Sequence, residues 1–198
     1  ARALQALSER LGAGQLITPA GMDSGNAGLL SGYGFLTAKP IIVVVNTGER
    51  TADISALQER VAQLGLDLFL IQGRQEMEIA LLPPEDQREF LADLGVSHSA
   101  RDRFLRQVYG SLDLISFLTA GDKDVRAWSI PSGATALKAA GRIHTDLARG
   151  FIRAEVVPYE DLVTAGGFAQ AKKVGKLRLE GKDYLVADGD VLTIRFKV

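Results

Sequence analysis

The first half of the chain contains short, closely spaced apolar segments. Leucines recur at helical intervals over residues 1–11, which predicts an amphipathic helix ending at Gly12. Residues 41–45 are an unbroken run of isoleucine and valine, typical of a strand buried on both faces in a parallel sheet. Residues 54–64 have a helical pattern, and residues 66–71 form a second strand-like run. Strand, helix and strand within about thirty residues predict a right-handed βαβ unit.

Two further helices are predicted after this unit. Residues 85–94 follow a pair of prolines and end before a glycine, and residues 100–109 have apolar side chains on one side. The glycine-rich stretch 12–34 contains several turn signals, and residues 29–36 form a candidate short helix. Because two strands do not make a stable open sheet, we expect further strands of this sheet to lie upstream of the sequence given.

The second half of the chain alternates strand-like runs with one helical segment. The strand-like runs are residues 112–118, 125–130, 151–157, 177–179, 184–186 and 191–196. The last two are joined by Asp188-Gly189-Asp190, and Asp-Gly between apolar runs is a strong turn signal. Strands, one helix and then strands predict a sheet that wraps over a helix, an α+β arrangement. No low-complexity linker separates the halves, so we expect a packed junction near Gly110.

Composition restricts the class of protein. With 198 residues, 46% hydrophobic and 24% charged, the chain is typical of one medium or two small soluble domains. The absence of cysteine excludes disulfides, thiol nucleophiles and cysteine-based zinc sites. A formal charge of −1 gives no nucleic-acid signature by itself. No apolar run approaches the roughly 20 residues that span a membrane, so we expect no membrane partner.

The beginning of the chain carries a further expectation. It has no signal peptide and starts at an alanine rather than a methionine. We therefore expect it to be a piece of a longer protein.

The polar residues after the first buried strand are candidates for ligand binding. Asn46 and Glu49 follow residues 41–45 directly, and open α/β sheets bind ligands at the carboxyl ends of their strands. An amide and a carboxylate at this position could hydrogen-bond the edge of a nucleobase. In the alternative reading, Asn46 and Gly48 simply form a polar turn. The spacing alone favours the turn.

Other candidate groups have weaker support. His144 follows a predicted helix and precedes Asp146, which favours a hydrogen-bonding role in the fold over catalysis. His98 lies in a polar loop, where solvation is the simple interpretation. No histidine, aspartate and glutamate spacing indicates a metal site. Ser132 is not in a Gly-x-Ser-x-Gly motif, so hydrolase chemistry of that type has no support.

A phosphate-binding loop is absent from the sequence. Such a loop requires Gly-x-x-x-x-Gly-Lys followed by serine or threonine, and no such string occurs. Its backbone amides and lysine hold a triphosphate and its magnesium ion. We therefore assign no catalytic residue and no metal ligand, and we expect this chain alone to be inactive as a nucleotide hydrolase.

The strings of the C-terminal half resemble those of one known family. Residues 113–198 closely resemble the C-terminal TGS domain of the YchF proteins, also called Obg-like ATPases, which are P-loop nucleotide hydrolases. The matching strings, in order, are Phe117-Leu118-Thr119-Ala120-Gly121, Val125-Arg126-Ala127-Trp128, Ala139-Ala140-Gly141, Ile143-His144-Thr145-Asp146, Gly150-Phe151-Ile152, Tyr159-Glu160-Asp161, Gly175-Lys176, Glu180-Gly181-Lys182-Asp183-Tyr184 and Asp188-Gly189-Asp190-Val191. The resemblance implies a ubiquitin-like β-grasp fold for this part.

The resemblance extends upstream. Residues 35–40 and the strand after them look like the late part of the family's nucleotide-binding domain. Asn46-Thr47-Gly48-Glu49 then falls on its modified base motif, Asn-x-x-Glu where most GTPases have Asn-Lys-x-Asp, a change associated with accepting ATP. This match reverses the preference for a simple turn at Asn46. The second base-contact loop departs from the family pattern, because it reads Gln72-Gly73-Arg74.

Together these observations give one leading hypothesis. The chain is an α/β fragment of a P-loop NTPase, a parallel-sheet part plus helices, followed by an α+β TGS domain. Residues 1–38 would be the end of a helical insertion with a connecting helix, 39–110 the C-terminal part of the nucleotide-binding domain, and 111–198 the TGS domain. Asn46, Thr47, Glu49 and Gly73 would bind the nucleotide, ATP or GTP with Mg²⁺, whose Mg²⁺ ligands lie outside this chain.

A second hypothesis comes from a different class of protein. Similar proteins are cytoplasmic and associate with ribosomes, so the TGS domain could be a binding module without catalysis that docks on RNA or a protein. Its candidate phosphate contacts are Lys172, Lys173, Lys176 and Arg178. A solvated, lysine-rich turn is the alternative for each of these residues.

Overall fold

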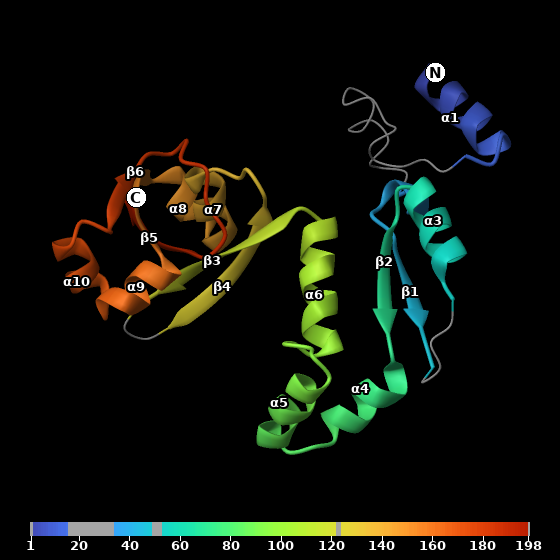
Figure 1. The fold of residues 1–198 in the computed structure, drawn as a ribbon. Coiled ribbons are helices and arrows are strands. Elements are labelled where there is room, and N and C mark those ends of the chain that lie inside the picture. The colour runs from blue at the N-terminus through green and yellow to red at the C-terminus, as the bar shows by residue number, and fades with distance from the viewer. Residues whose placement is uncertain (1, 16–33, 49–52, 122–123, 198) are drawn as a thin grey trace. The chain divides into compact units, whose positions relative to one another are not determined.

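The computed structural model describes residues 2–15, 34–48, 53–121 and 124–197 (Figure 1). The chain divides into two compact units, Ala1–Ser111 and Leu112–Val198. Asp113, just after the division, has a φ of 50°, which is uncommon for a residue with a side chain. Most of the helix predicted over residues 29–36 lies outside the described residues. Across the ranges that the structure describes, no helix is both long and apolar enough to cross a membrane.

The N-terminal unit contains two strands and a series of helices. Its elements are α1 (Arg2–Gly12), the 3-10 helix η3 (Leu36–Ala38), β1 (Ile42–Asn46), α3 (Ser55–Gln63), β2 (Asp67–Ile71), α4 (Gly73–Ala80), α5 (Pro84–Asp93) and α6 (Ala100–Ser111). The five helices and strands predicted between residues 41 and 109 all form, and β1 and β2 pair in parallel as expected, with Ile42 opposite Asp67 and Asn46 opposite Ile71. Helix α4 was not predicted.

The expectation that residues 41–45 are buried on both faces is wrong for this chain. No residue of β1 is buried, and the side chain of Val44 is 52% exposed. In the described part of the chain this sheet has two strands, so β1 has a neighbour on one side only. Its β-branched residues favour a strand, but burial requires further elements on the faces and the edge.

Helix α6 packs against β2 through both apolar and polar contacts. The Phe69 and Phe104 rings meet edge to face, with centroids 5.1 Å apart. The Gln107 amide donates to the carbonyl oxygen of Leu68 at 3.1 Å, and Ser111 donates to the carboxylate of Asp67. These contacts fix α6 along β2, and Phe69 is buried, as are Val61, Ile79 and Ala100 of the neighbouring helices.

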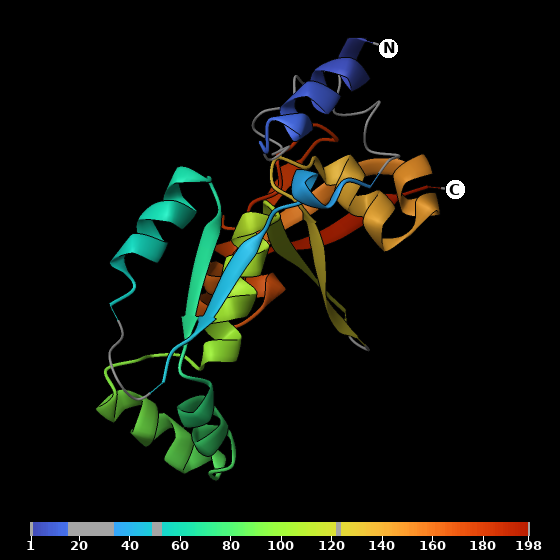
Figure 2. The same cartoon turned by 90° about the vertical axis from the view of Figure 1, so that its right-hand side faces the viewer.

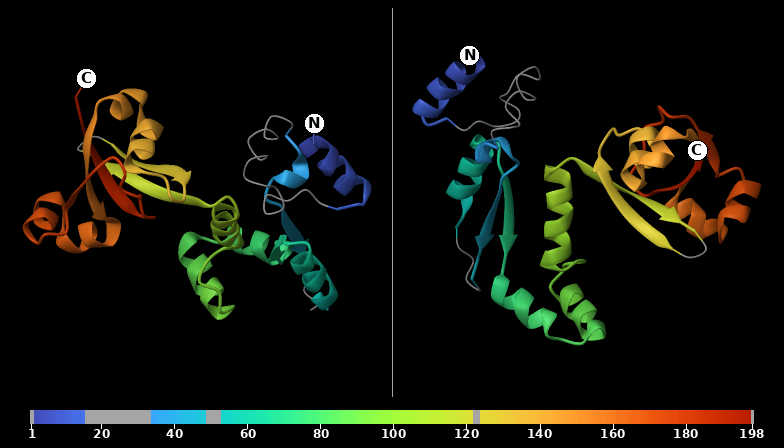
Figure 3. Two further views of the ribbon diagram at one scale, coloured as in Figure 1. Left: turned by 90° about the horizontal axis from the view of Figure 1, so that it is seen from above. Right: turned by 180° about the vertical axis from the view of Figure 1, so that it is seen from behind.

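The C-terminal unit is a five-stranded sheet with helices on it. Its elements are β3 (Leu114–Ala120), β4 (Val125–Pro131), α7 (Ala136–Ile143), α8 (Thr145–Arg149), β5 (Phe151–Pro158), α9 (Tyr159–Ala165), α10 (Phe168–Lys173), β6 (Arg178–Glu180) and β7 (Asp190–Phe196). The strand order is β4-β3-β7-β5-β6, and β3 and β7 pair in parallel while the other pairs are antiparallel. Figure 3 shows α7 and α8 side by side next to this sheet.

The core of this unit lies between the sheet and α7. Phe117, Val156 and Leu192 from three neighbouring strands are almost fully buried with Ala136 and Ala139 of the helix. The small alanines let the helix approach the sheet closely. A second cluster, around Val157, Ala171 and Val191, packs α9 and α10 against the sheet. The predicted α+β arrangement, a sheet over a helix, is therefore confirmed for this unit.

Of two expectations for the end of the chain, one is corrected and one is confirmed. Residues 184–186 form no strand: Leu185 makes only an isolated bridge to Thr135, and β7 pairs with β3 and β5 instead. Asp188-Gly189-Asp190 does turn, since Gly189 has a φ of 79° and its N–H donates to the carbonyl oxygen of Ser116. A turn signal is local, whereas the choice of partner strand depends on the whole sheet. Helices α9 and α10 were also not predicted.

Candidate functional site

The parallel strands β1 and β2 end at one edge of their sheet. Asn46 is the last residue of β1 and lies opposite Ile71, the last residue of β2. Helix α4 begins two residues later, at Gly73. Figure 2 shows both strands pointing toward this helix. The segments after the two strands are thus brought to the same edge, as the sequence predicted for a parallel pair.

Asn46 and Gly73 are in direct contact at this edge. The Asn46 Oδ1 accepts a hydrogen bond from the Gly73 N–H at 2.9 Å. A Cβ atom added at Gly73 would lie 3.1 Å from Asn46 Oδ1, which is tighter than an ordinary contact. Glycine therefore lets the start of α4 approach the amide oxygen, and the Asn46 Nδ2 carries two N–H donors that can serve another partner. The structure brings together two residues that are 27 positions apart in the sequence.

Thr47 is fixed at the same edge by its backbone and side chain. Its N–H donates to the carbonyl oxygen of Ile71 at 2.8 Å, and its Oγ1 donates to the same oxygen at 3.3 Å. Glu49, the fourth member of the predicted base site, lies outside the described residues. Three of the four predicted residues can therefore be located, and all three lie at the carboxyl edge of the sheet.

Two cavities adjoin this edge. One, of about 700 Å³, is mostly apolar and includes Gly73, Val44, Phe69 and Phe104 in its lining. The other, of about 490 Å³, is lined by Thr47, Gly48, Ile54, Leu70, Ile71, Gln72, Gln75, Glu76, Leu91, Leu94, Val96 and Arg103. The smaller cavity combines an apolar wall with several polar side chains, the usual character of a small-molecule site.

A charged pair borders the smaller cavity. Arg103 Nη2 lies 3.1 Å from Glu76 Oε1, and the other carboxylate oxygen of Glu76 accepts the N–H of Ala100 at 2.9 Å. The Arg103 guanidinium also lies over the Phe69 ring, 5.7 Å from its centroid. This pair links the first turn of α4 to the first turns of α6. Sequence reasoning did not single out Gln75 or Arg103, because neither belongs to a motif and Arg103 lies on a separate helix.

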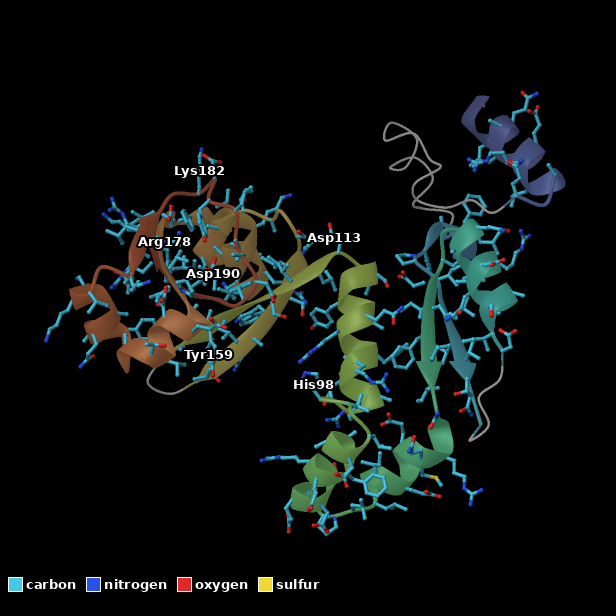
Figure 4. All side chains as sticks on the ribbon, in the orientation of Figure 1. His98, Asp113, Tyr159, Arg178, Lys182 and Asp190 are labelled. Atoms are coloured by element: carbon cyan, nitrogen blue, oxygen red, sulfur yellow. The ribbon has the colours of Figure 1, made fainter. Side chains whose placement is uncertain are left out.

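The four basic residues predicted as partner contacts are in different situations. Lys176 Nζ lies 3.1 Å from Asp161 Oδ1. Arg178 donates to the Tyr184 hydroxyl at 2.9 Å, and that hydroxyl donates to the buried Asp190 at 2.8 Å. Figure 4 labels Arg178 and Asp190 in this unit. Lys172 and Lys173, in the last turn of α10, are exposed and form no ion pair with another described residue.

Burial and hydrogen bonding affect the tyrosine of this network. Burial, followed by its hydrogen bond to Asp190, raises the pKa of the Tyr184 hydroxyl. Arg178 opposes this shift and also lies over the Tyr184 ring, 5.4 Å from the centroid. The network ties β6 to the start of β7, which is a role in the fold rather than in binding.

The remaining candidates have structural roles or none. His144 is the N-cap of α8, and its Nδ1 accepts the N–H of Asp146 at 3.2 Å, the hydrogen-bonding role that the sequence favoured. In the ranges that can be described, no group of three or more histidine, aspartate and glutamate side chains is arranged to hold a metal ion.

Comparison with known proteins places the chain among related sequences. Residues 114–197 match the family described as "YchF-GTPase_C: Protein of unknown function (DUF933)". The protein named "Ribosome-binding ATPase YchF" from Pasteurella multocida is 44% identical over 181 residues, which cover 89% of this chain and 50% of that protein. The protein of the same name from Bacillus subtilis is 44% identical over 170 residues, which cover 82% of this chain and 46% of that protein.

A solved structure agrees with these sequence matches. The structure of the Schizosaccharomyces pombe YchF GTPase superposes with a TM-score of 0.85 at 25% identity, and the match covers 98% of this chain and 53% of that one. The chain belongs to the YchF family. It spans about half the length of the curated YchF relatives it matches. The mixed α/β fold of both units is thus that of a YchF protein.

Proposed function

We propose that this YchF chain supplies the base-binding edge and the C-terminal TGS domain of a cytoplasmic, ribosome-associated protein that binds and hydrolyses ATP or GTP. In this assignment residues 1–38 end a helical insertion, 39–110 complete the nucleotide-binding domain, and 111–198 form the TGS domain. The observation that carries the proposal is the Asn46–Gly73 hydrogen bond, which joins the two predicted base-contact loops at the carboxyl edge of a parallel sheet.

The residues at this edge suit a purine base. The Asn46 Nδ2 can donate to a ring nitrogen or carbonyl, and the Thr47 Oγ1 can accept from an amino group. Apolar residues such as Ile54 and Leu94 line the adjoining cavity of about 490 Å³ and can cover the faces of a planar ring. Glu49 would accept from an amino group of the base. Bound Mg²⁺ with the triphosphate would supply the electrostatic stabilisation of phosphoryl transfer, and its ligands are expected outside this chain.

The strand order supports a ubiquitin-like β-grasp fold for residues 111–198. Counted within the C-terminal unit, the order is second, first, fifth, third, fourth, with a parallel central pair. Helix α7 follows the second strand and packs on one face of the sheet. This is the arrangement expected of a TGS domain, which in the proposal positions an RNA or protein partner.

Base binding can be tested on this chain by NMR titration with adenosine and guanosine. We expect adenosine to shift the amide signals of Asn46, Thr47 and Gly73 at millimolar concentrations, because base contacts without phosphates are weak. Replacing Asn46 by alanine should abolish these shifts, while the matched change Gln58→Ala on the exposed face of α3 should leave them unchanged. If neither nucleoside shifts these three signals, the proposed base site is wrong.

Hydrolysis of ATP or GTP requires the half of the protein that contains the phosphate-binding loop. We would join this chain behind the corresponding half of the Bacillus subtilis YchF protein and measure phosphate release from ATP and from GTP. We expect ATP to be preferred and the preference to depend on Glu49. A strong preference for GTP that persists in Glu49→Ala would rule out the assignment of this residue.

The second candidate function is ribosome docking by the TGS domain without catalysis. Lys172 and Lys173 support it, since both are exposed and form no ion pair within the described part of the chain. Lys176 and Arg178 contribute less in this proposal because intramolecular partners already engage them. Neutralising two phosphate contacts should weaken RNA binding and flatten its salt dependence.

Ribosome co-sedimentation over a range of salt concentrations tests this candidate. We expect the double variant Lys172→Ala/Lys173→Ala to bind more weakly and with a smaller salt slope than the wild type. The double variant Lys138→Ala/Lys182→Ala removes the same charge from exposed positions elsewhere in the unit and serves as the control. Equal binding by the wild type and both variants would remove α10 from consideration.

A further inference from the structure

The C-terminal sheet carries two arginines directly opposite each other. Arg153 of β5 and Arg195 of β7 are register partners in an antiparallel pair, and both residues are exposed. Partners of this kind have their Cβ atoms about 5 Å apart, and like charges placed there destabilise a sheet. Local features that cost stability are expected at functional sites. The arginine pair therefore needs an explanation other than the stability of the fold.

One carboxylate belongs to the same group of side chains. Arg195 Nη2 donates to Glu155 Oε1 at 3.1 Å and to Oε2 at 3.2 Å. The Glu155 side chain is 21% exposed and that of Arg195 is 61% exposed, so the guanidinium lies nearer the solvent than its partner. Two guanidiniums and one carboxylate leave this group with a net positive charge. Guanidinium N–H groups bind the oxygens of phosphates in pairs, so the group suits a phosphate.

The two arginines lie on the face of the sheet that also carries α10. Alternate residues of a strand point to opposite faces. Ala154, next to Arg153, is buried in the core beneath α7, so Arg153 points to the other face. Val157, four residues on from Arg153, points the same way and packs against Ala171 of α10. Helix α10 thus covers one end of this face, and the arginine pair lies roughly 13 Å away along β5.

We infer that this face, from Lys172 and Lys173 to the Arg153–Arg195 pair, is the surface that docks on ribosomal RNA, with both guanidiniums bound to backbone phosphates. The inference rests on the proposed ribosome docking and deepens it by naming the partner and a second group of contacts. The open part of β5 and β7 presents arginine, glutamate and threonine, with Leu179 of β6 beside them. Such a polar, positively charged surface is typical of nucleic-acid interfaces, whereas protein interfaces have a more apolar centre.

The test compares Arg153→Gln/Arg195→Gln with the wild type in binding to ribosomes and to protein-free ribosomal RNA over a range of salt concentrations. Losing two phosphate contacts should lower the slope of log K against log salt by about 1.4 to 1.8, and should weaken binding about tenfold or more at low salt. The control, Arg126→Gln/Arg149→Gln, removes the same charge from exposed positions on β4 and α8 and should bind as the wild type does.

A variant with the opposite expected effect keeps the test decisive if the double variant folds poorly. Glu155→Gln removes the carboxylate that engages Arg195 and leaves this guanidinium free for a phosphate. We expect RNA to bind Glu155→Gln about threefold more tightly than the wild type, the usual size of a surface ion-pair effect. Loss of the fold would not give tighter binding.

The outcomes separate this inference from the docking proposal. If Lys172→Ala/Lys173→Ala weakens ribosome binding while Arg153→Gln/Arg195→Gln and Glu155→Gln bind as the wild type does, the inference fails and the docking proposal stands. If ribosomes bind the chain and protein-free RNA does not, the partner is a ribosomal protein and the inference is overturned. If the wild type binds no ribosomes, both are wrong.

Discussion

The two units contain strands of similar apolar character but bury them to very different extents. In the N-terminal unit no residue of β1 is buried, although it consists of isoleucine and valine up to Asn46. In the C-terminal unit Phe117, Val156 and Leu192 are almost completely buried on neighbouring strands. The difference lies in the number of elements around each strand. An apolar, β-branched sequence favours a strand, whereas burial of that strand requires neighbouring strands and helices that cover its faces.

The largest expected effect is at the centre of the C-terminal core. Replacing Phe117 by alanine should destabilise this unit by about 3–5 kcal/mol, because it removes a fully buried ring and leaves a cavity. Trp128 stacks with Phe117 at 6.5 Å between ring centroids and is the only tryptophan of the chain. Urea unfolding followed by its fluorescence measures the loss. A loss below about 1 kcal/mol would contradict the fully packed core described for this unit.

A smaller effect is expected at the buried carboxylate of the same unit. Asp190 is 2% exposed and accepts hydrogen bonds from the Tyr184 hydroxyl and the Ala187 N–H. Replacing Asp190 by alanine should cost about 1–3 kcal/mol, because two donors lose their acceptor. The same urea titration measures this loss of stability. The exposed Asp183 provides a matched control, and Asp183→Ala should change stability by less than about 0.5 kcal/mol.

The raised pKa of Tyr184 predicts a modest pH dependence. Below about pH 10 the hydroxyl is protonated in both states and its contribution is fully present. As the pH rises, the unfolded chain loses this proton first, so the free energy of unfolding falls until the folded state ionises as well. Unfolding measured between pH 8 and about pH 11 should show this decrease, and Tyr184→Phe should flatten it. An identical decrease in the variant would show that another group is responsible.

The smallest effect is expected on the open face of the N-terminal sheet. Val44 is 52% exposed, so Val44→Ala should cost less than about 1 kcal/mol. Hydrogen exchange of the β2 amides measures the stability of this unit separately from Trp128. A loss as large as that of Phe117→Ala would mean that β1 is covered after all, and the contrast between the units would not hold.

Most elements of the fold could be predicted from the sequence. Apart from α4, the helices and strands between residues 41 and 109 follow from periodicity and from the prolines and glycines that bound them. Helix α4 was not predicted because a glycine after a strand-like run usually marks the end of an element. In the structure Gly73 is instead the first residue of a helix, and its lack of a side chain lets Asn46 approach closely. Helices α9 and α10 are short, and seven and six residues carry little periodic signal.

The candidate site was partly predictable. Asn46 and Thr47 follow a strand directly, so their place at the sheet edge comes from the sequence alone. Arg103 could not be found in this way, because its contact with Glu76 joins residues 27 positions apart on different helices. Such contacts depend on how helices pack and leave no short motif.

The sequence by itself therefore determined most of the elements, the parallel pair and the turn at Gly189, since these depend on residues close together in the chain. Only the tertiary structure decided that β7 pairs with β3 and β5 rather than with residues 184–186, because strand partners are chosen by the burial of a whole sheet. It also decided that Asn46 contacts Gly73 and that, among the described residues, Lys176 and Arg178 have side-chain partners while Lys172 and Lys173 form no ion pair. Each of these depends on how the folded chain brings together groups from different elements.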